Sequence, residues 1–276
     1  MLSTFQCENN LFTSSLPVLI NAPRLRFLDL SGNKLTGSIP EGFLPTTAHL
    51  SMEYMHLFSN HLSGSLSENV GNYVELRDLL LHENQFTGSI PKNLSNCRHL
   101  ASLLLQKNSF TGLPDLPFQY HTDSMYQLQT VDISSNAFSG TIPSAFFAMP
   151  SIVYFASSQN CFHGELPESV CDSSTLEQLY LEGLRSGQEC KTRIFGSFSD
   201  VYLSEALAGT IPHCIWAMTS LRFLFLSGNL LGGTLPAETQ RNYSSLQYIG
   251  KCNCNVFEFM QYSDALFWKI ATFNLP

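Results

Sequence analysis

Leucine and other large apolar residues recur along the chain in the spacing LxxLxL, and an asparagine follows three residues after each group. Leu76, Leu79, Leu81 and Asn84 show this pattern in full. The last two apolar residues are two apart, so they share one face of a short β-strand, while the residues beside them face the other way. The pattern therefore predicts a series of short strands, each with one apolar face.

The asparagine position repeats along the chain, at intervals of 23 to 28 residues as far as residue 160. Glycine follows four residues after this position in most copies, and proline ends most units. One such strand cannot bury its apolar face alone, so we expect the copies to stack about 4.8 Å apart in a parallel sheet. The asparagine amides are expected to satisfy backbone groups where each strand turns. These structural residues are Asn10, Asn33, Asn60, Asn84, Asn108, Asn136, Asn160 and Asn229.

The unit LxxLxLxxNxLxGxIP resembles the plant-type leucine-rich repeat, which the GxIP ending distinguishes. Residues 76 to 91 match every element, and the resemblance covers roughly residues 2 to 236. It implies an α/β repeat fold class, namely a leucine-rich-repeat solenoid or horseshoe. In that fold a parallel β-sheet lines the concave face, and 3₁₀ turns, loops and short second strands form the convex face. Nine strands imply a concave face about 40 Å long.

Breaks in the repeat indicate the domain organisation. We expect residues 1–240 to form an array of about nine repeats with an inserted loop at 185–204, and 241–276 to form a divergent tail or a degraded repeat. Neither a signal-peptide pattern nor an apolar membrane-spanning stretch is present, and no capping segment is recognisable at either end. We therefore expect a fragment of a longer protein, which the resemblance implies is extracellular or membrane-associated.

Composition excludes several kinds of partner and chemistry. Only 13% of residues are charged and the net charge is -8, which argues against binding to nucleic acid or to an anionic membrane. The sequence has no GxSxG, HExxH, phosphate-loop or kinase motif and no CxxC pair. It therefore predicts a protein that is not an enzyme and holds no metal or cofactor.

Cysteines and glycosylation sequons bear on the cellular compartment. Cys171, Cys190 and Cys214 flank or lie within the inserted loop, and a disulfide from Cys190 to either of the others would attach that loop to the array in an oxidising compartment. The alternative is that the loop is a tolerated insertion without such a bond. Sequons at Asn93 and Asn242 lie outside the predicted strands, where a glycan is tolerated.

Solvent-facing strand positions are the candidate binding residues. Aromatic side chains cluster toward both ends of the predicted sheet, and two leucines lie between them. Such side chains, when they do not pack against the core, are typical of binding hot spots. Their β-propensity, or packing against segments of a longer chain, would also account for them. The candidates are Phe27, Tyr54, Phe58, Leu80, Leu104, Tyr154, Tyr180, Phe223 and Phe225.

The resemblance implies a recognition module similar to the ectodomains of receptor-like proteins and receptor kinases, which would bind a peptide or protein on the concave face and engage a co-receptor. One alternative is a soluble leucine-rich-repeat inhibitor of a secreted hydrolase, and another is a non-functional fragment of a larger receptor. Ice binding would need a regular row of short polar residues such as Thr, whereas the columns here are mixed.

Overall fold

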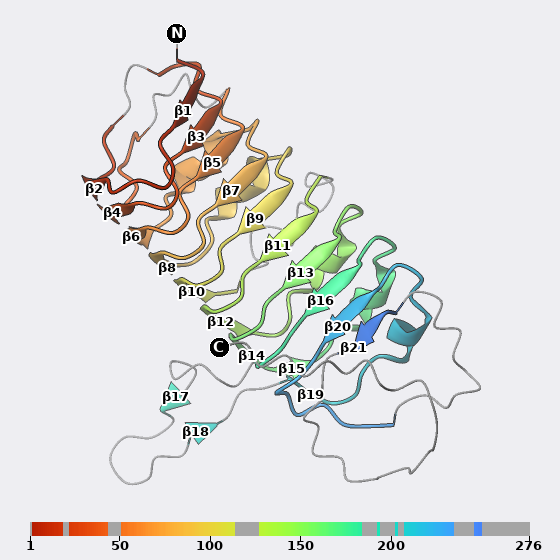
Figure 1. Ribbon diagram of the computed structural model, residues 1–276. Coiled ribbons are helices and arrows are strands. Elements are labelled where there is room, and N and C mark those ends of the chain that lie inside the picture. Colours follow the sequence, from red (N-terminus) through yellow and green to blue (C-terminus); the bar gives the residue numbers. More distant parts are fainter. Residues whose placement is uncertain are drawn as a thin grey trace.

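The computed structural model describes residues 2–18, 22–43, 51–113, 127–183, 192–193, 202–203, 207–234 and 246–249 of the 276-residue chain. These residues form a solenoid in which each repeat adds one strand to a parallel sheet on the concave face (Figure 1). The sheet contains, in order, β1 (Thr4–Gln6), β3 (Phe27–Asp29), β5 (Tyr54–His56), β7 (Asp78–Leu80), β9 (Ser102–Leu104), β11 (Thr130–Asp132), β13 (Tyr154–Ala156), β16 (Gln178–Tyr180), β20 (Phe223–Phe225) and β21 (Tyr248–Ile249).

A second parallel sheet runs along the solenoid beside the first (Figure 1). Its strands begin just after the repeated asparagine, where the chain has left the first sheet. They are β2 (Thr13–Ser15), β4 (Lys34–Gly37), β6 (His61–Ser65), β8 (Gln85–Gly88), β10 (Ser109–Gly112), β12 (Ala137–Gly140) and β14 (Cys161–Phe162). Two smaller pairs are β15 (Gly164–Glu165) with β19 (Leu207–Ala208), and the antiparallel β17 (Thr192–Arg193) with β18 (Tyr202–Leu203).

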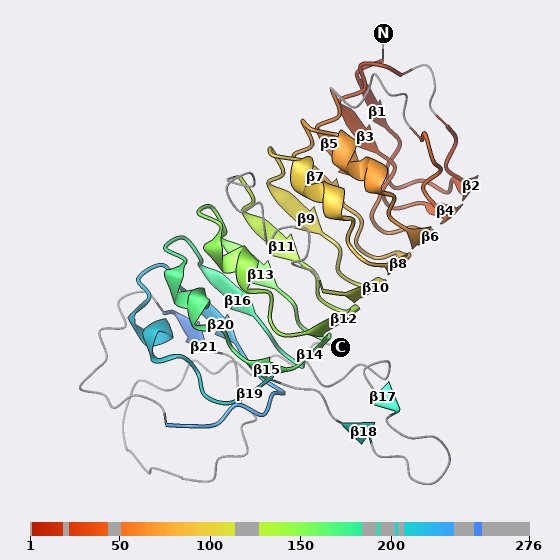
Figure 2. The same cartoon turned by 180° about the vertical axis from the view of Figure 1, so that it is seen from behind.

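Short 3₁₀ helices carry the chain back across the convex face (Figure 2). They are η2 (Glu68–Asn72), η3 (Lys92–Asn96), η5 (Ser144–Ala148), η6 (Glu168–Asp172) and η8 (His213–Ala217). The predicted leucine-rich-repeat solenoid is confirmed, and its helical component in the described ranges is 3₁₀ rather than α. No helix among these residues is long and apolar enough to cross a membrane.

Leucine columns fill the space between the faces, because the middle residue of each strand points inward. Leu79 on β7 and Leu103 on β9 are fully buried, as is Val131 on β11. A second column continues the core beneath the other sheet, where Phe86, Phe110 and Phe138 stack with ring centroids 6.1 Å apart. Burial of each such ring stabilises the fold by about 1.5–3 kcal/mol.

The repeated asparagines connect adjacent repeats rather than binding a ligand. Asn60, for example, donates its amide hydrogens to the carbonyl oxygens of Leu30, Leu57 and Phe58, and its side-chain oxygen accepts a hydrogen bond from the backbone NH of Leu35. Asn84, Asn108, Asn136 and Asn160 repeat this arrangement one turn further along each time. At the N-terminal end, Asn10 is exposed and, among the residues that the structure describes, bonds within its own turn, to Cys7 and Glu8. Near the other end Asn229 donates to Leu181 and Leu226.

The predicted division into an array of residues 1–240 and a tail of 241–276 lies partly outside the described residues, as does most of the predicted loop at 185–204. Within that loop the structure describes the two-residue strands β17 and β18, which pair antiparallel and so do not continue the parallel sheets.

Candidate ligand-binding face

The concave face has half-buried side chains because the strand residues that flank each buried leucine point away from the core. The strands pair in one constant register, in which the first residue of every strand lies beside the first residue of the next. The predicted face residues therefore form continuous columns. The first column runs through Phe27, Tyr54, Asp78, Ser102, Thr130, Tyr154, Gln178 and Phe223.

Aromatic rings gather at the N-terminal end of this face, in what we call the N-terminal patch: Phe27, Tyr54 and Phe58 with His56 and His82. Phe27 lies 5.5 Å from Tyr54 and edge-on to His56 at 5.2 Å, measured between ring centroids. Phe58 stacks on His82 at 4.4 Å. The structure thus brings the three predicted aromatic residues together and adds two histidines to them.

A second group, the C-terminal patch, comprises Tyr154, Tyr180, Phe223 and Phe225 on β13, β16 and β20 (Figure 1). Tyr154 and Tyr180 lie 5.4 Å apart, and Tyr180 stacks on Phe225 at 4.5 Å with only 11° between the ring planes. Burial and the neighbouring Asp132 carboxylate raise the pKa of Tyr154, so this phenol stays protonated and can donate a hydrogen bond at neutral pH.

Leu80 and Leu104 occupy paired positions on β7 and β9, between the two patches, and both are half-buried. The structure therefore places all nine predicted residues on one face, in two aromatic groups joined by an apolar pair. Partly exposed apolar groups of this kind are the usual core of a binding surface.

Three carboxylates also lie on the face, at the strand positions of Asp29, Asp78 and Asp132. His56 lies between the first two, with its Nδ1 3.5 Å from Asp29 Oδ2 and its Nε2 3.7 Å from Asp78 Oδ2. Asp132 instead accepts a hydrogen bond from the backbone NH of Ser134 at 2.9 Å. Burial raises the pKa of the Asp132 carboxyl, which the hydrogen bonds from Ser134 and the charge of Lys107 only partly oppose.

Basic residues beside the face are engaged with glutamates. Lys107 Nζ lies 2.6 Å from Glu83 Oε1, and the hydrogen bonds from Lys107 and Ser59 lower the pKa of Glu83. Arg26 and Arg77, just before β3 and β7, both face Glu53, just before β5, at 2.6 and 3.8 Å. These pairs leave the aromatic patches without a neighbouring free cation in the described part of the face.

The disulfide differs from the sequence-based expectation. Cys171 on η6 is bonded to Cys214 on η8, with 5.8 Å between the Cα atoms. The prediction that Cys190 pairs with one of these two is therefore wrong. The reason is that η6 and η8 occupy the same place in successive convex turns, so the 43-residue separation in sequence closes in space. Cys190 itself lies outside the described residues, and Cys161 is also disulfide-bonded.

The sequon at Asn93 lies on η3, on the convex side, with the asparagine exposed. A glycan there would extend away from the concave face. The second sequon asparagine, Asn242, lies outside the described residues.

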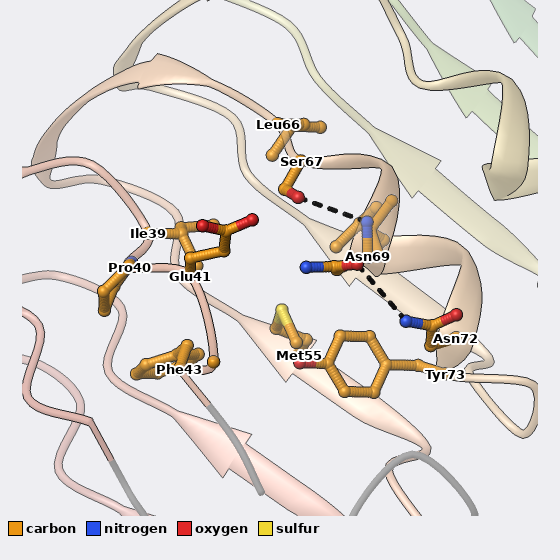
Figure 3. A pocket seen from close by; sticks show the side chains of 13 residues that line it. Ile39, Pro40, Glu41, Phe43, Met55, Leu66, Ser67, Asn69, Asn72 and Tyr73 are labelled. Atoms are coloured by element: carbon orange, nitrogen blue, oxygen red, sulfur yellow. Dashed lines mark hydrogen bonds between the residues drawn. The ribbon is translucent and has the colours of Figure 1, made fainter. Parts of the chain in front are cut away.

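Sequence reasoning missed a pocket of about 200 Å³ between the segment Ile39–Phe43 and η2 (Figure 3). Its wall is mostly apolar, with Met55 and Tyr73 facing inward. Burial raises the pKa of Tyr73 to about 12, so it stays neutral. The pocket is separate from the face, and no cluster of three metal-ligating side chains occurs in the described ranges.

Repeated parallel strands, the asparagine ladder and the convex 3₁₀ turns define a leucine-rich-repeat solenoid. A family model described as Leucine Rich Repeat matches residues 24–45, 75–97, 127–149 and 220–242. The chain thus contains leucine-rich repeats. It is 32% identical to Receptor-like protein 35 of Arabidopsis thaliana over 239 residues, which cover 86% of this chain and 24% of the relative. It therefore spans about a quarter of the length of that protein.

Two solved structures show the same architecture. One is the Arabidopsis receptor kinase HAESA in complex with the peptide hormone IDA and the co-receptor SERK1, with a TM-score of 0.68, 26% identity, and coverage of 90% of this chain and 41% of that one. The other is PEPR1–AtPEP1, with a TM-score of 0.65, 25% identity, and coverage of 87% and 33%. The chain is thus similar to ectodomains of plant leucine-rich-repeat receptors.

Proposed function

We propose that this chain is a non-catalytic recognition module, part of the ectodomain of a receptor-like protein, and that it binds an extended peptide or protein segment on its concave face. The observation that carries the proposal is the pair of half-buried aromatic patches on a regular sheet face. Rings of this kind lose solvent-exposed apolar area when a ligand covers them, which favours binding.

The setting of the face supports the proposal. The HAESA structure holds a peptide hormone and a co-receptor. By analogy, a co-receptor would be the second partner of the complete protein. The bond between Cys171 and Cys214 and the exposed sequon at Asn93 favour an extracellular location, because disulfides persist in oxidising compartments.

The test is binding of a phage-displayed library of random twelve-residue peptides to the purified chain. Clones selected on the wild type should lose binding to the triple variant Tyr154→Ala/Tyr180→Ala/Phe225→Ala, with an unchanged circular dichroism spectrum. The control variant Lys92→Ala/Arg98→Ala changes exposed residues of η3 and its C-terminal end and should retain binding. Equal binding to the concave triple variant would refute the assignment of the face. Inhibition of a secreted hydrolase by the wild type would favour the inhibitor alternative.

A further inference from the structure

We propose that the ligand is an extended peptide that carries two apolar or aromatic side chains about seven residues apart, one for each patch. A basic residue lies between them, about four positions from the side chain at the N-terminal patch and about three from the side chain at the C-terminal patch. This inference rests on the proposed function and specifies the class of peptide that the concave face would select. It follows from the spacing of the two patches and from the location of one carboxylate.

The spacing comes from the constant register of the sheet. Tyr54, at the centre of the N-terminal patch, lies on β5, and Tyr180, at the centre of the C-terminal patch, lies on β16. Five steps between neighbouring strands separate them, through β7, β9, β11 and β13. At about 4.8 Å a step the separation is about 24 Å, which an extended chain covers with about seven residues at roughly 3.3 Å each.

The surface between the patches leaves room for a peptide backbone. The first residue of each strand here is polar and small or medium in size, and the last is a leucine or an aspartate: Asp78, Ser102 and Thr130 at the first position, and Leu80, Leu104 and Asp132 at the last. Aromatic rings are absent from these strands, β7, β9 and β11. A peptide that crosses them can therefore lie closer to the sheet than over either patch, with its two large side chains directed into the aromatic groups.

The position of Asp132 is the reason to expect a basic residue in the middle of the peptide ligand. It lies on β11, three strand steps from β5 and two from β16, or about 14 Å and 10 Å. These distances correspond to about four and three residues of an extended peptide.

The carboxylate of Asp132 has no cationic partner within 4 Å among the described residues. Lys107, whose positive charge acts on Asp132 to lower its pKa, forms an ion pair with Glu83 in which Nζ lies 2.6 Å from Oε1. Asp29 and Asp78 differ, because both lie near His56. Burial leaves the Asp132 carboxylate poorly solvated, which also raises its pKa, so an ammonium or guanidinium group from a ligand would gain a charge-assisted hydrogen bond there.

Selection from a random twelve-residue phage library on the wild-type chain, with depletion on Tyr180→Ala/Phe225→Ala, tests the spacing. Enriched peptides should carry two aromatic or large aliphatic residues six to eight positions apart, with Arg or Lys between them. Peptides that depend on the face but show no such spacing would overturn this inference and leave the proposed function intact. A library with no clone that depends on the face would overturn both.

A charge exchange tests the role of Asp132. The best selected peptide should bind Asp132→Lys at least tenfold more weakly, and its Arg→Glu form should recover most of that loss on the same variant. Asp132→Asn, which keeps the shape of the side chain, should lower the preference for the Arg peptide over its Gln form. Asp172→Lys, at an exposed convex position on η6, is the matched control and should leave affinity unchanged. Equal affinity of wild type and both Asp132 variants would overturn the inference.

Discussion

The imidazole ring of His82 lies flat on the phenyl ring of Phe58, with 4.4 Å between the ring centroids and 8° between the planes. This contact links the segments that follow β7 and β5, within the N-terminal patch. Burial lowers the pKa of His82 below 6.5, against the raising effect of Glu83, while the charges of Lys107 and His56 lower it further. The folded protein therefore favours the neutral ring, because burial against an aromatic face costs a neutral imidazole less hydration energy than a charged one.

Acidification should destabilise the folded chain through His82. Its folded-state pKa lies below the unfolded value of 6.5, so the unfolded state binds more protons as the pH falls through 6.5. The free energy of unfolding should decline in that window, and His82→Gln, which cannot titrate, should lose less. Urea unfolding at pH 5 and pH 7.5 measures both proteins. Parallel losses in wild type and variant would contradict the prediction.

Loss of one asparagine from the ladder should destabilise the whole array. Asn136 donates to the carbonyl oxygens of Leu105 and Ile133, and accepts from the backbone NH of Phe110. Asn136→Ala leaves these buried groups unpaired, so we expect a loss of about 2–4 kcal/mol in the free energy of unfolding. Asn10→Ala, at the exposed end of the same column, should cost less than about 1 kcal/mol. Equal losses in urea titrations would show that the column does not act through burial.

The columns themselves could be predicted from sequence, because alternation along a strand fixes which residues face the core. The backbone conformation of the residue just before each repeated asparagine could not be predicted. Ser59, Glu83 and Lys107, each just before a column asparagine, adopt positive φ angles of 52–57°, whereas Gly32 and Gly228 fill the equivalent position in other repeats. Ser, Glu and Lys carry no signal for this conformation, so the neighbouring asparagine bonds and not the residue type impose it.

Side-chain contacts between neighbouring repeats could not be predicted from the sequence either. Column positions place Phe58 and His82 two residues after the adjacent strands β5 and β7, but the choice of rotamer decides whether the rings stack or diverge. Cys171 and Cys214 are separated by an insertion, so repeat counting did not indicate that η6 and η8 face each other. The face could be predicted as a set of positions, whereas its division into two packed patches depends on side-chain rotamers, which the repeat pattern does not specify.

The disulfide between η6 and η8 should contribute strongly to stability. It closes 43 residues of chain, and the entropy of the unfolded loop gives about 4 kcal/mol for the double variant Cys171→Ala/Cys214→Ala. Cys7→Ala, which removes a free and half-buried thiol, should cost much less. Thermal unfolding compares the variants, and disulfide mapping by mass spectrometry identifies the partners. A Cys171–Cys190 peptide in that map would contradict the structure.

Ser157 interrupts the leucine column of its repeat, and its replacement should stabilise the chain. The residue is fully buried and its Oγ has no hydrogen-bond partner among the described residues. Ser157→Ala removes a buried unpaired hydroxyl, so we expect a gain of about 1 kcal/mol. Its neighbour Ser158 is the control, because its Oγ accepts a hydrogen bond from the backbone NH of Glu182 and Ser158→Ala should lose about 1 kcal/mol. Equal losses of stability for both variants in urea unfolding would contradict the prediction that the buried Ser157 hydroxyl destabilises the fold.

The ionised carboxylate of Asp132 should reduce stability at neutral pH. Its pKa in the folded state lies above the unfolded-state value of 3.8. Between these two pKa values the folded state binds more protons than the unfolded state, so stability falls as the pH rises. Asp132→Asn removes the poorly solvated charge, and its urea midpoint at pH 7 should exceed that of the wild type. Because the wild-type side chain is protonated and neutral at low pH, the difference should shrink as the pH is lowered through the raised pKa of Asp132. A variant less stable than wild type at pH 7 would contradict this. The predicted gain is expected where a residue is retained for binding at some cost in stability.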